Sequence, residues 1–340
     1  MLRKLLNFFA KDLAMDLGTA NTLIYLRGQG IVLNEPSVVA IRPSDYKVLA
    51  VGHAARNMIG KHGKDIVTIR PLKDGVIADF EITSVMIKTF LSSVLKGRQL
   101  VRPKLVVAVP TGITAVEKRA VIEAAEQAGA GSIMLLEEPM AAAIGAGLHV
   151  DKPEGSMVVD IGGGTTEVAV ISMFAVACSE SVRTAGDEAN EAIMRHIQKK
   201  HQMIISEMMA EQIKIKIGSA LPFQKPLRLK VTGKEILTGI PRQFYVTDEE
   251  VREALREPTQ IIVESIKRVF EKTPAELAAD IHDKGIWLAG GGALLKGLNK
   301  LIERETGLPV HVDQDPLTAI VRGAGMVIED IKFYRPVFIN

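Results

Sequence analysis

Two segments of the chain repeat one pattern of apolar and polar positions. In residues 14–22 and again in 158–166, apolar positions are followed by Asp, an aliphatic residue, Gly, two small residues and a polar pair that ends in Thr. An alternating apolar stretch follows each segment, at 23–26 and at 168–171. This pattern predicts a strand, a tight glycine-containing turn and a second strand, placed twice in the chain.

The rest of the pattern alternates strands with amphipathic helices. Thr114 with Glu117 and Thr247 with Glu250 form capping boxes that each begin a helix, and we expect the second helix to be interrupted near Pro258 and to end near residue 272. The other predicted elements are strands at 104–110, 133–136 and 285–289, a β-rich stretch at 227–246, and helices at 114–127, 140–148, 186–200, 206–217, 293–305 and 317–330. This order implies an α/β protein of two related domains around a cleft, each with a smaller insertion, the first insertion lying within 34–73.

Composition narrows the class of protein. Of 340 residues, 47% are hydrophobic and 24% are charged, which is ordinary for a globular protein of roughly two domains. The net charge of +2 argues against nucleic acid as a partner. Cys178 is the single cysteine, which excludes an intrachain disulfide, and no apolar run is as long as a membrane span.

The first eleven positions form a short amphipathic stretch. Apolar residues recur there at helical spacing and basic residues fall on the other face; the apolar positions are Leu2, Leu5, Leu6 and Phe9. The apolar core is too short for a signal peptide. The pattern alone leaves open an interfacial helix on an anionic membrane and a first turn that packs on its own domain.

The two repeated turns have the chemistry of phosphate binding. Turns of small residues let backbone N–H groups approach a phosphate, and Asp16 and Asp160 at the strand ends can hold a hydrated Mg²⁺. A single copy would be read as an ordinary hairpin whose Asp caps a turn. Two matched copies favour a pair of loops that hold a nucleotide's phosphates from both sides.

Two further motifs follow strands. The run 290–292 is three glycines between a predicted strand and a predicted helix, which lets a ligand lie against the backbone, although neither the dinucleotide-binding G-x-G-x-x-G nor the P-loop motif is present. In Glu137-Glu138-Pro139, the proline is expected to keep the preceding residue extended, so that a carboxylate can orient or deprotonate a water. A solvated strand end is the alternative for one of the two glutamates.

A row of charges lies on one predicted helical face. Glu207, Glu211 and Lys214 are spaced i, i+4 and i+7, which suits either ribose hydroxyls or a surface salt-bridge row, and spacing alone favours the surface row. The seven histidines show no metal-ligand spacing with Cys or carboxylates.

Together these motifs resemble the actin-like ATPase superfamily of actins, 70-kDa heat-shock chaperones, sugar kinases and bacterial filament proteins. Two phosphate loops, two connecting helices and an adenosine motif occur in the superfamily's order, at 16–19, 138–143, 160–165, 288–292 and 319–325. Within the superfamily, the chain closely resembles the MreB family of rod-shape-determining bacterial actins, at 16–22, 34–40, 70–79 and 137–147. The resemblance covers essentially the whole chain.

The resemblance implies a duplicated α/β, actin-like two-domain fold with ribonuclease-H-like βββαβα cores, a nucleotide cleft and two small inserted subdomains. The implied division is an amphipathic membrane-binding segment at 1–10, a first core subdomain at 11–32, 76–142 and 318–333 with an insertion at 33–75, and a second core subdomain at 143–180 and 246–317 with an insertion at 181–245.

It also implies ATP or ADP with Mg²⁺ in the cleft, and slow ATP hydrolysis coupled to filament assembly. Glu138 would orient the attacking water, with Asp160 and Thr165 as further catalytic residues, and Asp16 and Asp160 would hold the metal through water. The residues implied to bind the cofactor are Gly18, Thr19, Ala20, Asn21, Gly162, Gly163, Gly164, Thr165, Thr166, Glu211, Lys214, Gly290, Gly291, Gly292 and Ala293. Ribose contacts thus replace the surface row for Glu211 and Lys214, but not for Glu207.

The implied partners are further copies of the chain, the membrane and wall-synthesis proteins. Members of the family form polar-subunit protofilaments in antiparallel pairs on the inner face of the cytoplasmic membrane and act with membrane proteins of cell-wall elongation. Membrane binding would use the amphipathic start of the chain or the apolar pair Leu100 and Val101, which lies in a basic loop and could otherwise be a solvated turn.

One position departs from the family pattern. Ser206 replaces the usual Gly before a helix, and Gly permits backbone conformations that Ser disfavours, so we expect local differences in the nucleotide pocket there.

The rival functions belong to the same superfamily. A small-molecule kinase would need a phosphoryl-acceptor pocket with a catalytic Asp, and none is identifiable from the sequence. A chaperone ATPase would need a further substrate-binding domain, and the cell-division homologue FtsA a differently placed subdomain and a C-terminal membrane helix. We expect neither from a segment that ends at residue 340.

Overall fold

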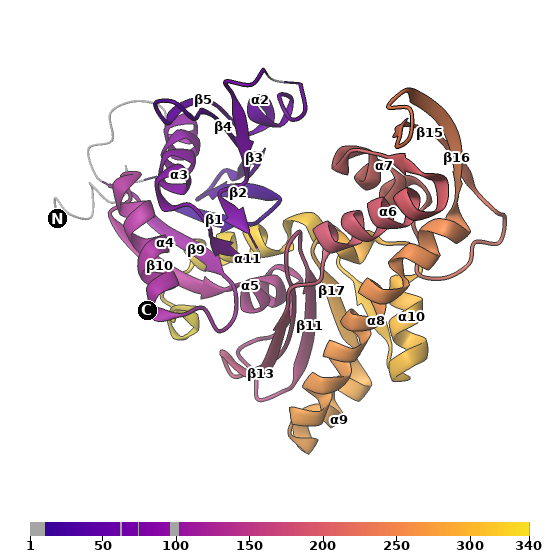
Figure 1. Ribbon diagram of the computed structural model, residues 1–340. Coiled ribbons are helices and arrows are strands. Elements are labelled where there is room, and N and C mark those ends of the chain that lie inside the picture. Colours follow the sequence, from indigo (N-terminus) through magenta and orange to yellow (C-terminus); the bar gives the residue numbers. More distant parts are fainter. Residues whose placement is uncertain (1–10, 62, 74, 96–101, 340) are drawn as a thin grey trace. The chain divides into compact units, whose positions relative to one another are not determined.

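The computed structural model describes residues 11–61, 63–73, 75–95 and 102–339. The chain divides into two units (Figure 1). Unit 1 comprises Met1–Glu154, Ile171–Val176 and Leu317–Asn340, and unit 2 comprises Gly155–Val170 and Ala177–Pro316. Among the described residues, no helix has both the length and the apolar character that a membrane crossing needs.

Unit 1 is built on a five-stranded sheet of order β10-β9-β1-β2-β3. The hairpin strands β1, β2 and β3 pair antiparallel, while β9 runs parallel to β1 and β10 parallel to β9. The bounds are β1 Leu13–Leu17, β2 Asn21–Leu26, β3 Gly30–Pro36, β9 Lys104–Val109 and β10 Ser132–Glu137. Every residue of β1 is buried, as expected of a central strand covered on both faces.

Helices cover both faces of this sheet. Alternate strand residues such as Met15 and Val107 join one apolar core with α3 (Phe80–Val94) and α4 (Ala115–Gln127). On the opposite side, α11 (Ala319–Glu329) contacts β1, β2 and β9 and packs closely against α5 (Glu138–Gly145). At that crossing a Cβ on Gly323 would overlap the carbonyl oxygen of Ala141, so the approach of the two helices depends on glycine.

The sheet of unit 2 has the same plan. Its order is β13-β12-β11-β17-β18, in which three strands consecutive in the chain lie side by side and β17 and β18 add parallel to β11. The bounds are β11 Ser156–Ile161, β12 Thr166–Ser172, β13 Ala175–Val182, β17 Ile286–Ala289 and β18 Val310–Val312, with helices α8 Asp248–Lys272, α9 Ala275–Lys284 and α10 Leu298–Thr306. Both predicted hairpins and the duplication are therefore confirmed.

Small sheets accompany each large one. In unit 1 they are β5-β4-β6 (β4 Val39–Arg42, β5 Lys47–Val51, β6 Val67–Ile69), with the short helix α2 (His53–Arg56), and the pair β7 (Leu72–Lys73) and β8 (Val76–Ile77). In unit 2 the sheet β14-β15-β16 (Met203–Ile204, Arg228–Glu235, Pro241–Thr247) shares a separate apolar core with α6 (Gly186–His201) and α7 (Glu207–Ile217). The exact boundaries of four subdomains stay a prediction.

Two expectations about helices are wrong. Both capping boxes are present, but α8 continues through Pro258 without interruption. The hydroxyl of Thr259 donates to the carbonyl of Leu255 (2.8 Å), and the buried apolar face of α8, which includes Ile262 and Val263, outweighs the bond that the proline removes. The helix expected from residue 293 begins at Leu298, because Gly291–Leu294 forms a 3₁₀ turn instead.

Candidate functional site

The first predicted phosphate loop joins β1 to β2 in unit 1 and is held by residues from outside the hairpin. A Cβ on Gly18 would lie 2.8 Å from the carbonyl oxygen of Asn21, so the turn has room only for glycine. The hydroxyl of Ser37 donates to the carbonyl of Gly18 (2.6 Å), and Thr19 Oγ1 accepts the N–H of Gly75 (3.2 Å). These two bonds hold the loop against neighbouring segments of unit 1.

The second loop joins β11 to β12 in unit 2 and is closed by its own backbone. The N–H of Gly162 donates to the carbonyl of Thr165 (2.9 Å). The carbonyls of Gly162 and Gly163 accept the N–H groups of Gly186 (3.1 Å) and Asp187 (2.8 Å), which begin α6. The loop and the start of α6 therefore form one rigid backbone unit suited to an anion.

Each hairpin has a matched, fully buried threonine at the start of its second strand. Thr22 Oγ1 lies 2.9 Å from Ser37 Oγ, and Thr166 donates its hydroxyl to the carbonyl of Thr184 (2.6 Å). Each hydroxyl thus ties the second hairpin strand to a neighbouring segment. The role proposed for Thr166 toward a nucleotide stays a prediction, as do those of Ala20, Asn21, Gly164 and Thr165.

Asp160 carries the strongest sign of an ion site. Its side chain is only 3% exposed, and Oδ1 has no hydrogen-bond partner among the described residues. Burial raises the pKa of this carboxyl from 3.8 to about 7. An orphaned, buried carboxylate oxygen fits a cation or its bound water, so the chemistry of the site agrees with hydrated Mg²⁺. Asp16, at the equivalent position in unit 1, is also buried.

The glycine run 290–292 packs directly on the end of β11. Gly290 has a φ of 76°, and a Cβ there would lie 2.7 Å from Oδ1 of Asp160. A Cβ on Gly292 would overlap the side chain of Ile161. These two glycines therefore bring β17 and its 3₁₀ turn against the aspartate, and the side chain of Ala293 is buried there.

The structure brings Lys214 to the second loop. Its ammonium donates to the carbonyl of Gly186 (2.7 Å), and burial lowers its pKa while the charges of Glu211, Asp187 and Glu207 oppose that shift. Lys214 is therefore not part of a solvated surface row, contrary to what spacing alone favoured. The ribose contacts proposed for Glu211 and Lys214 stay predictions.

Ser206 causes no local strain. It is the N-cap of α7 with φ −76° and ψ 157°, a conformation open to any residue, and its hydroxyl accepts the N–H of Met209 (3.3 Å). The backbone conformation at this position is therefore not one that Ser disfavours, and the expected differences in the nucleotide pocket stay a prediction.

Glu138 is buried, and it begins α5 rather than ending a strand. Pro139 therefore sits in the first turn of a helix, where proline is tolerated, and the extended residue is Glu137 (φ −67°, ψ 137°). Burial raises the pKa of Glu137, while the charge of Lys118 and the N–H of Gly112 oppose that shift. Neither glutamate is an exposed strand end.

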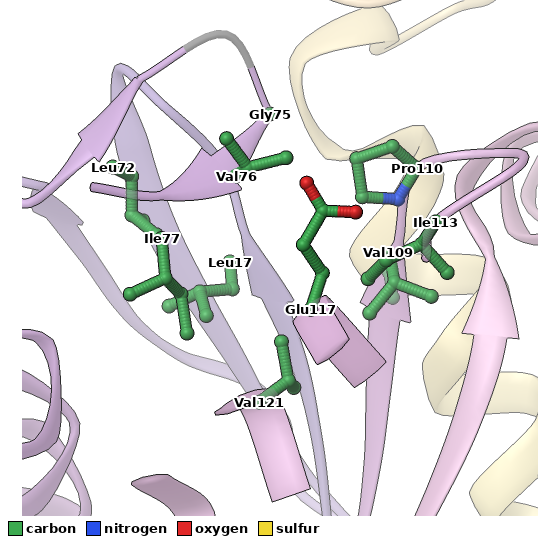
Figure 2. Close-up of a pocket in the computed structure, with 11 residues that line it drawn as sticks. Leu17, Leu72, Gly75, Val76, Ile77, Val109, Pro110, Ile113, Glu117 and Val121 are labelled. Carbon is green, nitrogen blue, oxygen red and sulfur yellow. The ribbon is translucent and has the colours of Figure 1, made fainter. Parts of the chain in front are cut away.

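A small pocket beside the first loop contains none of the predicted site residues. It is mainly apolar and lies between β8, the end of β9 and the start of α4 (Figure 2). The carboxylate of Glu117 at its wall accepts the N–H (2.8 Å) and the hydroxyl (2.6 Å) of Thr114. That carboxylate is part of the helix cap.

The predicted membrane residues cannot be placed in the fold. Leu2, Leu5, Leu6, Phe9, Leu100 and Val101 all lie outside the described residues.

Two units of matching strand order, each with an aspartate next to the end of its first hairpin strand and a glycine turn after it, define an actin-like fold. The crystal structure of MreB 5 of Spiroplasma citri bound to AMPPNP is similar to this chain, with a TM-score of 0.91 and 34% identity over 95% of this chain and 97% of that chain. A subunit of a MamK double helical filament, at 21% identity and a TM-score of 0.81, has the same fold.

The family is equally clear from sequence. The family model described as MreB/Mbl protein matches residues 10–335, and the chain belongs to this family. The cell shape-determining protein MreB of Escherichia coli K12 is 50% identical over 340 residues, covering 98% of each chain. The cell shape-determining protein Mbl of Bacillus subtilis 168 is 46% identical over 323 residues, covering 95% of this chain and 97% of that protein.

Proposed function

We propose that this chain is an ATP-dependent cytoskeletal filament protein that maintains rod shape. It would polymerise on the inner face of the cytoplasmic membrane and organise cell-wall synthesis there, as a peripheral protein. Membership of the MreB/Mbl family along almost the whole chain carries this proposal, and relatives in Escherichia coli and Bacillus subtilis are named as cell shape-determining proteins.

Nucleotide binding would use the two glycine turns that the sequence pattern repeats. The Spiroplasma citri relative was crystallised with AMPPNP and with ADP. In this chain the two glycine turns would offer backbone N–H groups to phosphate oxygens, and Lys214 with Glu211 would contact the ribose. Bound Mg²⁺, held through water by Asp16 and Asp160, would neutralise phosphate charge.

Hydrolysis would be slow and would depend on Glu138. A carboxylate at this position would orient the attacking water and accept its proton, with Thr165 near the terminal phosphate. The buried start of α5 is a rigid place for such a group, because helix and strand backbone hold it on both sides.

The partners would be other copies of the chain, in antiparallel pairs of protofilaments, together with anionic lipid and membrane proteins of wall elongation. The amphipathic segment 1–10, or Leu100 with Val101, would contact the lipid.

Negative-stain electron microscopy with and without ATP, and with and without anionic liposomes, tests this function. We expect filaments with ATP, in pairs, bound to the liposome surface. A protein that stays monomeric and does not bind lipid would overturn the proposal. Phosphate transfer from ATP to members of a sugar panel, without filaments, would instead support a small-molecule kinase.

A further inference from the structure

Residues 333–339, which we call the β10 strap, leave α11 and return to the sheet of unit 1. Phe338 forms an antiparallel bridge with Leu136 of β10, and the N–H of Ile339 donates to the carbonyl of Leu135 (3.1 Å). The strap thus pairs with β10 within two residues of Glu138, whose role belongs to the proposed function.

Several contacts hold the strap in place. At its start, the ring of Phe333 packs edge-on against Phe174, with centroids 5.4 Å apart. Val337 is buried, and Ile339 packs against the main apolar core of unit 1. At the far end, the ammonium of Lys118 on α4 donates to the carbonyl of Ile339 (3.1 Å). The strap is therefore fixed at both ends.

Without the strap, β10 would be an open edge strand. It is the last strand of its sheet and pairs on its other side with β9 alone, where Leu136 faces Ala108 and Glu137 faces Val109. An unpaired edge frays and shifts more readily than a strand bonded on both sides. The residue that follows β10 directly is Glu138.

We propose that the strap positions Glu138 for hydrolysis by pairing with the last residues of β10. Ile339 and Lys118 are then positioning residues, since neither would touch the nucleotide. Lys118 is well suited to this, because its charge also acts on Glu137, the residue between the strap pairing and Glu138. The proposal rests on hydrolysis by this chain, as proposed above.

Ile339→Pro removes the N–H that donates to Leu135 and also shortens a side chain that packs on the core, so its test needs a control for the second change. Phe338 has φ −78° and ψ 138°, the extended conformation that a following proline requires. Ile339→Ala is the matched control, since it shortens the side chain but keeps the N–H. Lys118→Met and Lys118→Arg form a second pair, in which Arg keeps a donor for the Ile339 carbonyl.

Small displacements of a catalytic group lower turnover more than binding. We expect Ile339→Pro and Lys118→Met to lower the single-turnover rate of ATP hydrolysis by about threefold to tenfold, with the Kd for ATP within about twofold of wild type. Ile339→Ala and Lys118→Arg should retain most of the rate. In a Glu138→Gln background the same substitutions should have no further effect, which a general loss of stability would not reproduce.

Hydrogen exchange at the amides of β10 separates the two proposals. If the wild-type chain does not hydrolyse ATP, the proposed function of Glu138 fails. Faster hydrogen exchange near the end of β10 in Ile339→Pro would still show that the β10 strap holds the end of this strand. Unchanged turnover and unchanged exchange in a folded Ile339→Pro protein would overturn the strap proposal. Should that variant not fold, equal turnover in Lys118→Met and wild type would overturn it instead.

Discussion

Asp160 is a buried carboxylic acid, and its burial makes the stability of the fold depend on pH. Its pKa of about 7, raised from 3.8 by burial, means that the folded state holds this proton more tightly than the unfolded state. The stability that the neutral carboxyl contributes is therefore complete below pH 3.8 and is lost as the pH rises through about 7. Bound cation would remove this penalty.

Asp160→Asn should abolish that pH dependence while keeping the shape of the side chain. Without nucleotide, we expect the variant to unfold a few degrees above wild type at pH 8 and within about a degree of it at pH 4.5, as measured by thermal unfolding. Asp65→Asn, at an exposed position, is the control and should show no such difference. An equal change at both pH values for Asp160→Asn would contradict the explanation by burial.

Glu138→Ala should separate turnover from binding. A group that positions water acts mainly in the transition state, so we expect the rate of phosphate release to fall by about 10²-fold and the Kd for ATP to change by less than about threefold. Glu137→Ala, at the neighbouring half-buried carboxylate, should reduce the rate far less. Parallel losses of affinity and turnover in Glu138→Ala would argue against the role.

The candidate residues for phosphate and metal binding could be recognised in the sequence. The residues that hold the loops in place could not. Asp16, Asp160 and the loop glycines stand out because the pattern occurs twice. Ser37 and Gly186, which hold the loops, lie 19 or more positions from their partners, and no local rule links them. Burial of Glu138 also depends on the packing of α5, which spacing does not reveal.

At the scale of elements, capping explains where helices begin. Both S/T-x-x-E capping boxes were predictable because each depends on four consecutive residues. The start of α10 was not predictable, since the backbone after β17 is set by contact of Gly290 and Gly292 with Ile161. The continuity of α8 through Pro258 likewise reflects burial of its apolar face.

The cap of α7 provides a test at this scale. Ser206→Ala removes the acceptor for the Met209 N–H and should lower the free energy of unfolding by about 1 kcal/mol. Ser206→Gly, which restores the usual family residue, should cost only a few tenths of a kcal/mol. Chemical denaturation measures both, and a more stable Ser206→Gly protein would show that Ser is strained after all.

At the scale of the whole molecule, the sequence predicted the duplication and the family but not the pairing of the smaller sheets. Short strands such as β6, β7 and β14 carry two or three residues each, too few for a periodic signal. Their partners are chosen by packing over long stretches of chain. The large sheets were predictable because their strands are buried, apolar and repeated.

Membrane attachment is tested on the assembled protein. Replacing Leu5, Leu6 and Phe9 with Ser should release filaments from anionic liposomes without abolishing assembly in solution, because apolar burial and basic charge together drive such binding. Co-sedimentation with liposomes measures the effect. Leu100→Ser with Val101→Ser is the comparison, and undiminished binding of the triple variant would move the anchor to that pair.

The buried threonines Thr22 and Thr166 occupy equivalent positions in the two units, and NMR can follow the methyl group of each. Each has a methyl group in the interior of its own unit, directly after a predicted phosphate loop. The hydroxyl of each is hydrogen-bonded to a neighbouring segment. In protein with ¹³C-labelled threonine methyl groups, the signals of Thr22 and Thr166, assigned by substitution, would report on the first and the second hairpin. Titration with nucleotide would reveal whether the two halves of the molecule respond together or one after the other.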